Sequence, residues 1–178
     1  MKKRITALGL LWCLSAVMLQ AARVDTVLVR SVAMNKDVKV VYVLPDKAIG
    51  KQACPVVYLL HGYGGNARSW MQLKPELPQM ADEKGIIFVC PDGKNSWYWD
   101  SPENPAYRYE TFVTSELVKY TDGNYATIPD RKARAISGLS MGGHGALWSA
   151  IRHKDVFGAA GSMSGGVDIR PFPQNWEM

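Results

Sequence analysis

Short, uninterrupted apolar runs alternate with helical patterns along most of this sequence. The four apolar runs lie at residues 55–60, 86–90, 133–137 and 157–163. The three helical patterns between them lie at residues 75–84, 107–120 and 142–153. A strand without polar alternation is typical of a sheet that is covered on both faces. Strands that alternate with helices in this way predict a doubly wound, mostly parallel α/β sheet.

Two further strands are expected before the first of these runs. Residues 25–32 alternate weakly between apolar and polar side chains, and residues 38–44 read Val-Lys-Val-Val-Tyr-Val-Leu. Both patterns favour strands, and the short connection between them favours a hairpin. We therefore expect an antiparallel hairpin at the N-terminal side of the parallel sheet.

The first 22 residues have the pattern of a secretory signal peptide. Lys2, Lys3 and Arg4 precede an apolar run over residues 5–19, and small residues follow it. A membrane anchor is the alternative, but the run is short of the roughly 20 residues that a spanning helix needs. We therefore predict that residues 1–22 are cleaved, that no stable membrane insertion remains, and that the protein is secreted or periplasmic.

Charge and cysteine content narrow the possible partners. The formal net charge is +5, and removal of the three basic residues of the leader leaves +2, so a nucleic-acid partner is not expected. Cys54 and Cys90 remain after cleavage, and a disulfide and two buried thiols are equally compatible with the sequence. No cysteine or histidine spacing indicates a metal site, so neither a metal nor another cofactor is predicted.

The third apolar run ends in the pentapeptide Gly138-Leu-Ser-Met-Gly142. A serine hydroxyl is a poor nucleophile unless it is exposed, oriented and deprotonated by a neighbouring base. A sharp turn between a strand and a helix exposes it, and such a turn leaves room only for glycine two residues before and after the serine. A simple glycine-rich turn is the alternative. The strand before and the helical pattern after the motif favour Ser140 as a catalytic nucleophile.

A second glycine-rich segment, His61-Gly-Tyr-Gly-Gly65, follows the first apolar run. Ester hydrolysis builds negative charge on the carbonyl oxygen, which backbone N–H groups stabilise when they are aimed at it in advance. We assign these oxyanion-hole amides to Tyr63 and to Met141, the residue after the serine. Gly62 and Gly64 are the neighbouring alternatives. A phosphate-binding loop is disfavoured because the required glycine and lysine spacing is missing.

These motifs resemble the esterase family of α/β-hydrolases, which includes S-formylglutathione hydrolases, feruloyl and acetylxylan esterases and mycolyltransferases. The resemblance runs from about Val24 to the end of the chain. It rests on the segments Leu60-His-Gly-Tyr-Gly-Gly-Asn66, Cys90-Pro-Asp-Gly93, Tyr109-Glu-Thr-Phe-Val-Thr-Ser-Glu-Leu117 and Ser137-Gly-Leu-Ser-Met-Gly-Gly-His-Gly-Ala146. The resemblance implies a serine carboxylesterase with an acyl-enzyme on Ser140 and with the oxyanion donors on Tyr63 and Met141.

The base that would activate the serine is missing from the expected positions. In this family the catalytic acid and then the catalytic histidine follow the nucleophile in the sequence. The histidines that follow Ser140 in this chain are His144 and His153. Both fall on the helix that leads away from Ser140, and His61 is expected to bond the backbone of its own loop. We therefore expect residues 23–178 to be the N-terminal part of a single α/β-hydrolase domain, incomplete at its C-terminus and nearly inactive by itself.

Two tryptophans suggest how a substrate would be held. The segment Asn95-Ser-Trp-Tyr-Trp-Asp100 follows the second apolar run, at the edge of the sheet where ligands bind. Its three adjacent aromatic side chains, above all Trp97 and Trp99, would stack on sugar rings or on an aryl acyl group. Packing on the surface of the domain itself is an equally good interpretation. Glu110 and Glu116 lie on the next helical pattern, where ion-pairing roles are favoured over catalysis.

The expected substrate is a small-molecule or polysaccharide ester. Three alternatives remain open at this point: an acyltransferase, a prolyl-oligopeptidase-type peptidase, and a catalytically dead secreted carbohydrate-binding or scaffold protein. The sequence does not indicate an oligomeric state.

Overall fold

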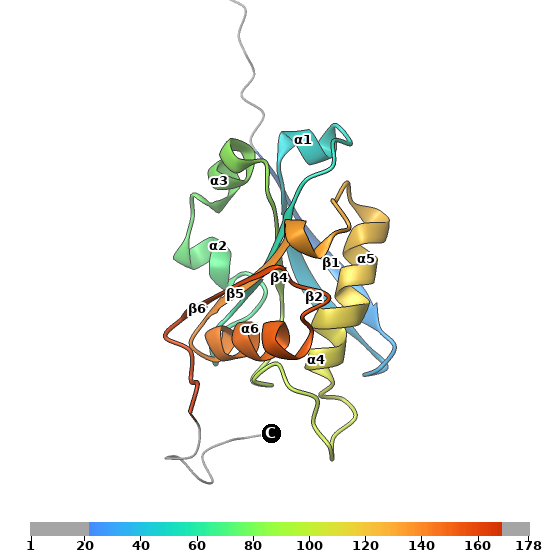
Figure 1. Cartoon of the computed structure of the whole chain (residues 1–178), viewed down its shortest axis with the longest axis vertical. Coiled ribbons are helices and arrows are strands. Elements are labelled where there is room, and N and C mark those ends of the chain that lie inside the picture. The colour runs from blue at the N-terminus through green and yellow to red at the C-terminus, as the bar shows by residue number, and fades with distance from the viewer. Residues whose placement is uncertain (1–21, 169–178) are drawn as a thin grey trace, which may run out of the picture.

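The apolar runs of the sequence form strands of a six-stranded sheet in the computed structural model, which describes residues 22–168 (Figure 1). The strands in chain order are β1 (Arg23–Ser31), β2 (Lys36–Leu44), β3 (Val56–Leu60), β4 (Ile87–Pro91), β5 (Arg134–Leu139) and β6 (Ala159–Met163). All six expected strands are confirmed, each within two residues of its expected ends. The expected signal peptide lies outside the described residues, apart from Ala22.

The order of the strands across the sheet is β1-β2-β4-β3-β5-β6. β1 runs antiparallel to β2, and β2 runs antiparallel to β4. The remaining neighbours, from β4 through β3 and β5 to β6, are all parallel. The predicted doubly wound, mostly parallel sheet with an N-terminal antiparallel hairpin is therefore confirmed.

Helices follow the strands from β2 to β5, and the longest of them lie between the parallel strands, where the periodic patterns predict them. They are α1 (Asp46–Ile49), α2 (Ser69–Leu73), α3 (Leu77–Lys84), α4 (Tyr109–Thr111), η1 (Phe112–Glu116), α5 (Leu117–Asn124), η2 (Arg131–Ala133) and α6 (Met141–Arg152). α3 ends at Gly85, which has a left-handed φ of 65°, a conformation in which glycine commonly terminates a helix. α1, α2 and η2 were not expected, because an element of one turn has no periodic pattern to detect.

The helix expected over residues 107–120 instead runs from residue 109 to residue 124 and contains a π-turn, η1, between α4 and α5. Within this segment the hydroxyl of Thr114 donates to the carbonyl oxygen of Glu110 at 2.8 Å. A threonine that bonds back to the preceding turn competes with the helical amide for that carbonyl. A regular helical pattern in the sequence does not reveal this local widening.

Alternate residues of the central strands enter two separate cores, one on each face of the sheet. Residues from the strands in the core beneath α4, α5 and α6 include Val40, Tyr42, Tyr58, Leu60, Ile87 and Val89. Residues from the strands in the core beneath α2 and α3 are Val41, Val43, Val57, Leu59, Phe88 and Cys90. The apolar runs are uninterrupted because both faces of these strands are covered.

β6 lies at one edge of the sheet, beside β5 (Figure 1). Four of its five residues are exposed and the fifth is partly exposed. In β5, buried and partly buried residues alternate. The sheet is therefore less completely covered by other parts of the chain at β6 than at its central strands.

The carboxyl ends of β3 and β5 lie next to each other. Leu60, the last residue of β3, pairs in register with Gly138 of β5. The chain leaves β3 toward β4 on one side and later returns to β5 on the other side, so the strand order reverses between β3 and β5. Open α/β sheets bind ligands at this kind of reversal. The topology therefore brings the segment after β3 and the segment after β5 to one place.

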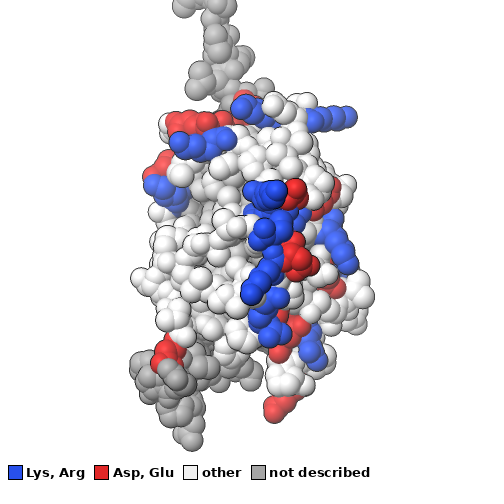
Figure 2. Space-filling view, viewed as in Figure 1, with Lys and Arg blue, Asp and Glu red and all other residues white. Residues whose placement is uncertain are grey.

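Charged side chains are unevenly spread over the face seen in Figure 2. Lysine and arginine form a band with acidic side chains beside them, and the surface between this band and the side of β6 carries almost no charge. Arg134 pairs with Asp122 at 2.6 Å, and Arg152 pairs with Glu110 at 2.7 Å.

None of the helices formed by residues 22–168 has the length and apolar character that crossing a bilayer requires.

Candidate active site

Ser140 occupies the turn between β5 and α6 in a backbone conformation that side chains rarely adopt. Its φ is 54° and its ψ is −117°, and the residue is exposed. Such conformations cost about 1–3 kcal/mol and concentrate at functional sites. The amide of Ser140 donates to the carbonyl oxygen of Met163 in β6 at 2.8 Å, which fixes the turn against the neighbouring strand. The chain therefore holds this serine out toward solvent.

The two glycines that flank Ser140 allow the backbone to turn this sharply. A Cβ atom on Gly138 would lie 2.2 Å from the carbonyl oxygen of Gly142. A Cβ atom on Gly142 would lie 2.2 Å from the carbonyl oxygen of Leu60 in β3. Neither contact can be relieved by moving a side chain, so both positions require glycine, as the motif predicts.

The segment of residues 61–65, which we call the oxyanion loop, lies directly against the serine. A Cβ atom on Gly62 would lie 3.6 Å from Cβ of Ser140 and 3.4 Å from the carbonyl oxygen of Leu139. The two motifs that the sequence places at separate positions are therefore in contact. This proximity is what an oxyanion hole beside a nucleophile requires.

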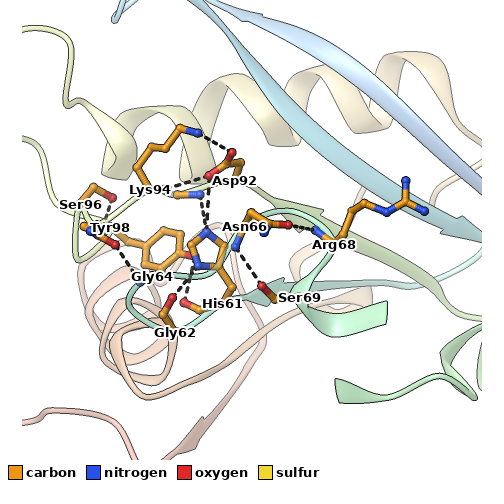
Figure 3. A network of polar contacts seen from close by, with 12 residues as sticks. His61, Gly62, Gly64, Asn66, Arg68, Ser69, Asp92, Lys94, Ser96 and Tyr98 are labelled. Atoms are coloured by element: carbon orange, nitrogen blue, oxygen red, sulfur yellow. Dashed lines mark hydrogen bonds and ion pairs between the residues drawn. The ribbon is translucent and has the colours of Figure 1, made fainter. Parts of the chain in front are cut away.

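His61 is buried at the start of the oxyanion loop and is fixed by hydrogen bonds at both ring nitrogens (Figure 3). Its Nε2 accepts from the amide of Gly93 at 2.9 Å, so this nitrogen carries no proton. Its Nδ1 lies 2.7 Å from the carbonyl oxygen of Gly62, which can only accept, so the proton is on Nδ1. These partners define a neutral imidazole with a structural role, as the sequence suggests.

Asp92 lies close to His61 but forms its ion pair elsewhere. Its Oδ1 is 3.7 Å from Nε2 of His61, a nitrogen that already accepts a hydrogen bond. Lys94 donates to the carboxylate twice, from Nζ at 2.8 Å and from its amide at 3.1 Å. Burial acts to raise the pKa of Asp92, but the polar contacts with His61 and Lys94 outweigh burial and hold this pKa well below its usual range.

The hydrogen-bond partners of the backbone amides near Ser140 bear on which of them could donate to an oxyanion. The amide of Gly64 donates to Oδ1 of Asn95 at 2.8 Å, so this amide is already engaged. Met141 is the first residue of α6, and amides in the first turn of a helix have no partner within the helix. The side chain of Tyr63 is half exposed. The bond to Asn95 therefore disfavours the amide of Gly64 as an oxyanion donor.

The three histidines of the sequence all lie in the described part of the chain, and each makes its hydrogen bonds away from Ser140. Nδ1 of His144 lies 2.7 Å from the carbonyl oxygen of Gly166, and burial lowers the pKa of this imidazole. Nε2 of His153 lies 2.8 Å from Oε1 of Glu110, at the far end of α6. No histidine therefore has a hydrogen bond to the serine in the described structure.

Trp97 and Trp99 pack against the helix that follows Ser140. Their rings lie 5.5 and 5.0 Å from the ring of His144. Trp99 also lies 5.4 Å from Trp148 and lines a groove of about 1180 Å³ beside α6. Ser140 does not line this groove. The rings thus contribute to packing, while their partial exposure leaves surface for a ligand.

Glu110 forms an ion pair with Arg152, as expected, whereas Glu116 accepts hydrogen bonds from uncharged groups. The carboxylate of Glu110 accepts hydrogen bonds from Trp148, Arg152 and His153, which ties α4 to α6. The carboxylate of Glu116 accepts bonds from the amides of residues 32 and 33 and from the hydroxyl of residue 31, which ties η1 to the β1–β2 hairpin.

The structure resolves the state of the cysteines that the sequence left open. Cys54 and Cys90 are both buried and both free, so the alternative of a disulfide is excluded in this structure. Among residues 22–168, no group of three histidine, cysteine, aspartate or glutamate side chains is placed to hold a metal ion.

The reversal of strand order at β3 and the exposed serine between β5 and α6 are features of an α/β-hydrolase. A sequence model of the Esterase family, described as "Putative esterase", matches residues 31–177. The chain therefore belongs to this family, and the resemblance inferred from its motifs is confirmed.

Similar proteins carry names of ester-cleaving and acyl-transferring enzymes. The chain is 28% identical over 132 residues to an acetyl esterase of Caldicellulosiruptor saccharolyticus, covering 70% of this chain and 49% of that protein. It is 34% identical over 154 residues to a diacylglycerol acyltransferase/mycolyltransferase of Mycobacterium leprae, covering 82% and 44%. A ferulic acid esterase of known structure has a TM-score of 0.70 at 32% identity, covering 81% and 60%. The chain thus spans about half the length of these relatives.

The structure corrects the ligand-stacking role expected for Tyr98, and it adds Asn95 to the candidate site. Both belong to the segment after β4, in which Tyr98 is fully buried and donates from its hydroxyl to the carbonyl oxygen of His61 at 3.2 Å. The adjacent tryptophans drew attention to this segment as a ligand surface. In the sequence, nothing distinguishes Tyr98 from the tryptophans on either side of it. Its complete burial and its bond to His61 are seen only in the structure.

Proposed function

We propose that this chain carries the nucleophile and the oxyanion hole of a serine carboxylic ester hydrolase. The observation that supports the proposal most directly is the conformation of Ser140, an exposed serine with a positive φ at the N-terminus of α6. Its contact with the oxyanion loop adds the second required element. Membership of the Esterase family agrees with this chemistry.

In the proposed reaction, Oγ of Ser140 attacks the carbonyl carbon of the ester while its proton passes to a general base. The carbonyl oxygen gains the negative charge and accepts hydrogen bonds from the amides of Tyr63 and Met141. Collapse of this intermediate breaks the bond to the alcohol oxygen, which takes the proton and leaves. Water then attacks the acyl group on Ser140, which releases the acid and restores the serine.

We propose that the base and its orienting acid are supplied from outside these 178 residues. The proposal is supported by the hydrogen bonds of His61, His144 and His153, none of which goes to Ser140. The length of the relatives, about twice that of this chain, leaves room for such residues. The 178-residue chain alone is then expected to be nearly inactive, while the whole protein hydrolyses esters.

The proposed substrates are small-molecule or polysaccharide esters, with Trp97 and Trp99 stacking on a ring of the substrate. Aromatic side chains stack on sugar and aryl rings, and Trp99 lines two neighbouring cavities, of about 1180 and about 280 Å³. The names of the relatives, an acetyl esterase and a ferulic acid esterase, agree with an acyl ester.

We further propose that residues 1–22 direct the protein to the periplasm or the cell exterior, and that residues 23–178 belong to one α/β-hydrolase domain. The basic start and apolar run of the leader support export. The sheet built from residues 23–163, with its shared cores, supports a single domain.

Acyl transfer is the second candidate, and the similarity to a diacylglycerol acyltransferase/mycolyltransferase favours it. The acyl-enzyme on Ser140 would be the same, and an alcohol would replace water in the second step. Product analysis with an added sugar acceptor separates the two: a new sugar ester indicates transfer, and free acid alone indicates hydrolysis.

The test compares hydrolysis of p-nitrophenyl acetate by the whole protein, by its Ser140→Ala variant and by the 178-residue chain. We expect Ser140→Ala to reduce kcat by a factor of at least about 10³. Loss of the nucleophile in another serine hydrolase reduces kcat by a factor of about 10⁶. Ser137→Ala on β5 is the matched control and should keep its activity. An active Ser140→Ala variant would refute the nucleophile. An active 178-residue chain would refute the external base, and cleavage of a dipeptide anilide would indicate a peptidase.

A further inference from the structure

One segment, residues 93–98, holds the oxyanion loop through three hydrogen bonds. The amide of Gly93 donates to Nε2 of His61, and the hydroxyl of Tyr98 donates to the carbonyl oxygen of His61 (Figure 3). The third bond runs the other way, from the amide of Gly64 to Oδ1 of Asn95 at 2.8 Å. The first two bonds fix the start of the loop, and only the bond to Asn95 reaches the turn at its tip.

The turn at the tip of the loop has the geometry of a type II turn. The amide of Gly65 donates to the carbonyl oxygen of Gly62 at 3.0 Å, which closes a four-residue turn with Tyr63 and Gly64 at its centre. Gly64 has a φ of 74°, the value of the third residue in a type II turn. Types I and II differ in the orientation of the central peptide group. The N–H of that peptide group is the amide that Asn95 accepts.

Asn95 is itself held in place by strained and buried neighbours. Lys94, Trp97 and Tyr98 all have positive φ values, of 50°, 54° and 60°. Bulky residues adopt this conformation only where the surrounding structure imposes it. The ring of Tyr98 supplies that constraint, because Cβ atoms on Gly93 and Gly145 would lie only 2.3 and 2.5 Å from it. The backbone segment that carries the acceptor oxygen of Asn95 is therefore held rigidly.

We propose that Asn95 is a positioning residue for the proposed ester hydrolysis. Its side-chain oxygen accepts from the amide of Gly64 and so holds the central peptide group of the turn in the type II orientation. This bond fixes the backbone position of Tyr63, whose own amide, in the preceding peptide group, is the proposed donor to the developing oxyanion. The proposal rests on the proposed function of Ser140. Asn95 acts through the loop and does not touch the reacting atoms.

The kinetic test measures kcat and KM of the whole protein on p-nitrophenyl acetate. Asn95→Ala removes the acceptor, so we expect kcat to fall roughly 10- to 100-fold, as for small misplacements of catalytic groups, with KM within about twofold. Asn95→Asp keeps an acceptor oxygen but adds a charge near the oxyanion, so its kcat should lie between those of wild type and Asn95→Ala. The matched control is Asn104→Ala, which removes a similar bond to the amide of Ala106. It should keep wild-type kinetics.

A second measurement on the whole protein needs no activity. Amide hydrogen exchange of Gly64, followed by NMR, should become at least about tenfold faster in Asn95→Ala and stay near the wild-type rate in Asn95→Asp. An unchanged Gly64 rate in Asn95→Ala would overturn the proposal, as would an increase in KM at unchanged kcat. If Ser140→Ala retains hydrolysis, the proposed function itself fails. If Ser140 is essential and Asn95→Ala is fully active, only the role of Asn95 fails.

Discussion

The Cβ position of Gly142 lies 2.2 Å from the carbonyl oxygen of Leu60, so α6 and β3 meet backbone to backbone beside Ser140. This approach links the helix that starts at the serine to the strand that ends at the oxyanion loop. The geometry of the site therefore depends on a contact between main-chain atoms that no side chain mediates.

Gly142→Ala should destabilise the fold, because the added methyl group overlaps main-chain atoms of β3. We expect the free energy of unfolding to fall by about 1–3 kcal/mol, which urea titration followed by circular dichroism measures. Gly123→Ala in α5 is the matched control, since a Cβ atom there meets nothing within 4 Å. It should be neutral or stabilising by up to about 1 kcal/mol. Equal losses in both variants would contradict the close contact.

Tyr98→Phe should cost about 1 kcal/mol of unfolding free energy, because it removes the hydroxyl that donates to the carbonyl oxygen of His61 and keeps the ring. Tyr98→Ala also empties the space between Gly93 and Gly145, so about 3–5 kcal/mol is expected. Urea denaturation of the two variants checks this order. Tyr120→Phe, on the partly exposed surface of α5, should leave stability unchanged. A Tyr98→Phe variant as unstable as Tyr98→Ala would argue against ring packing as the larger contribution.

Glu110 should make stability depend on acidic pH. Burial acts to raise its pKa, but hydrogen bonds from Arg152, Trp148 and His153 outweigh burial and lower it. A carboxyl whose pKa is lower in the folded state stabilises the fold above its unfolded pKa, about 4.3, and this contribution disappears as pH falls through the folded pKa. The unfolding free energy of wild type should therefore fall more steeply below about pH 4.3 than that of Glu110→Gln. Glu83→Gln, on exposed α3, should follow wild type; parallel curves for Glu110→Gln and wild type would contradict the pairing.

Cys54 and Cys90 should react with a thiol reagent only after unfolding. Both side chains are buried, and burial raises the pKa of Cys90 to about 12 and also that of Cys54, so neither is a thiolate at neutral pH. Addition of 5,5′-dithiobis(2-nitrobenzoate) to the native chain without its leader should give little colour, and urea should release two thiols. Two fast-reacting thiols in the native protein would show that the cores are open, and no thiols in urea would show a disulfide.

The sheet and the sharp turn at Ser140 could be predicted because each has a local signal in the sequence. Strands covered on both faces need uninterrupted apolar runs, and the turn at Ser140 needs glycine at positions 138 and 142. The rule that ligands bind at the carboxyl ends of parallel strands also predicts that the segments after these strands lie at one edge of the sheet.

The support of the oxyanion loop could not be predicted, because it consists of contacts between segments that are distant in the sequence. Asn95 accepts from Gly64, and Tyr98 fits between Gly93 and Gly145. Asparagine and tyrosine in a loop have many possible partners, and only the packed structure selects one. The role of Trp97 was undecided for the same reason, and the structure places its ring against His144.

The adjacency of β3 and β5 also has a consequence for how the chain reaches its native state. Leu60 and Gly138 become neighbours only after the intervening chain, with β4 and its helices, closes into a large loop. Pairing of strands so distant in sequence is entropically costly and slow, and it limits the folding rate of parallel sheets. Assembly of the serine beside its oxyanion loop therefore coincides with the slow topological step of folding, so a partly folded chain has no functional site.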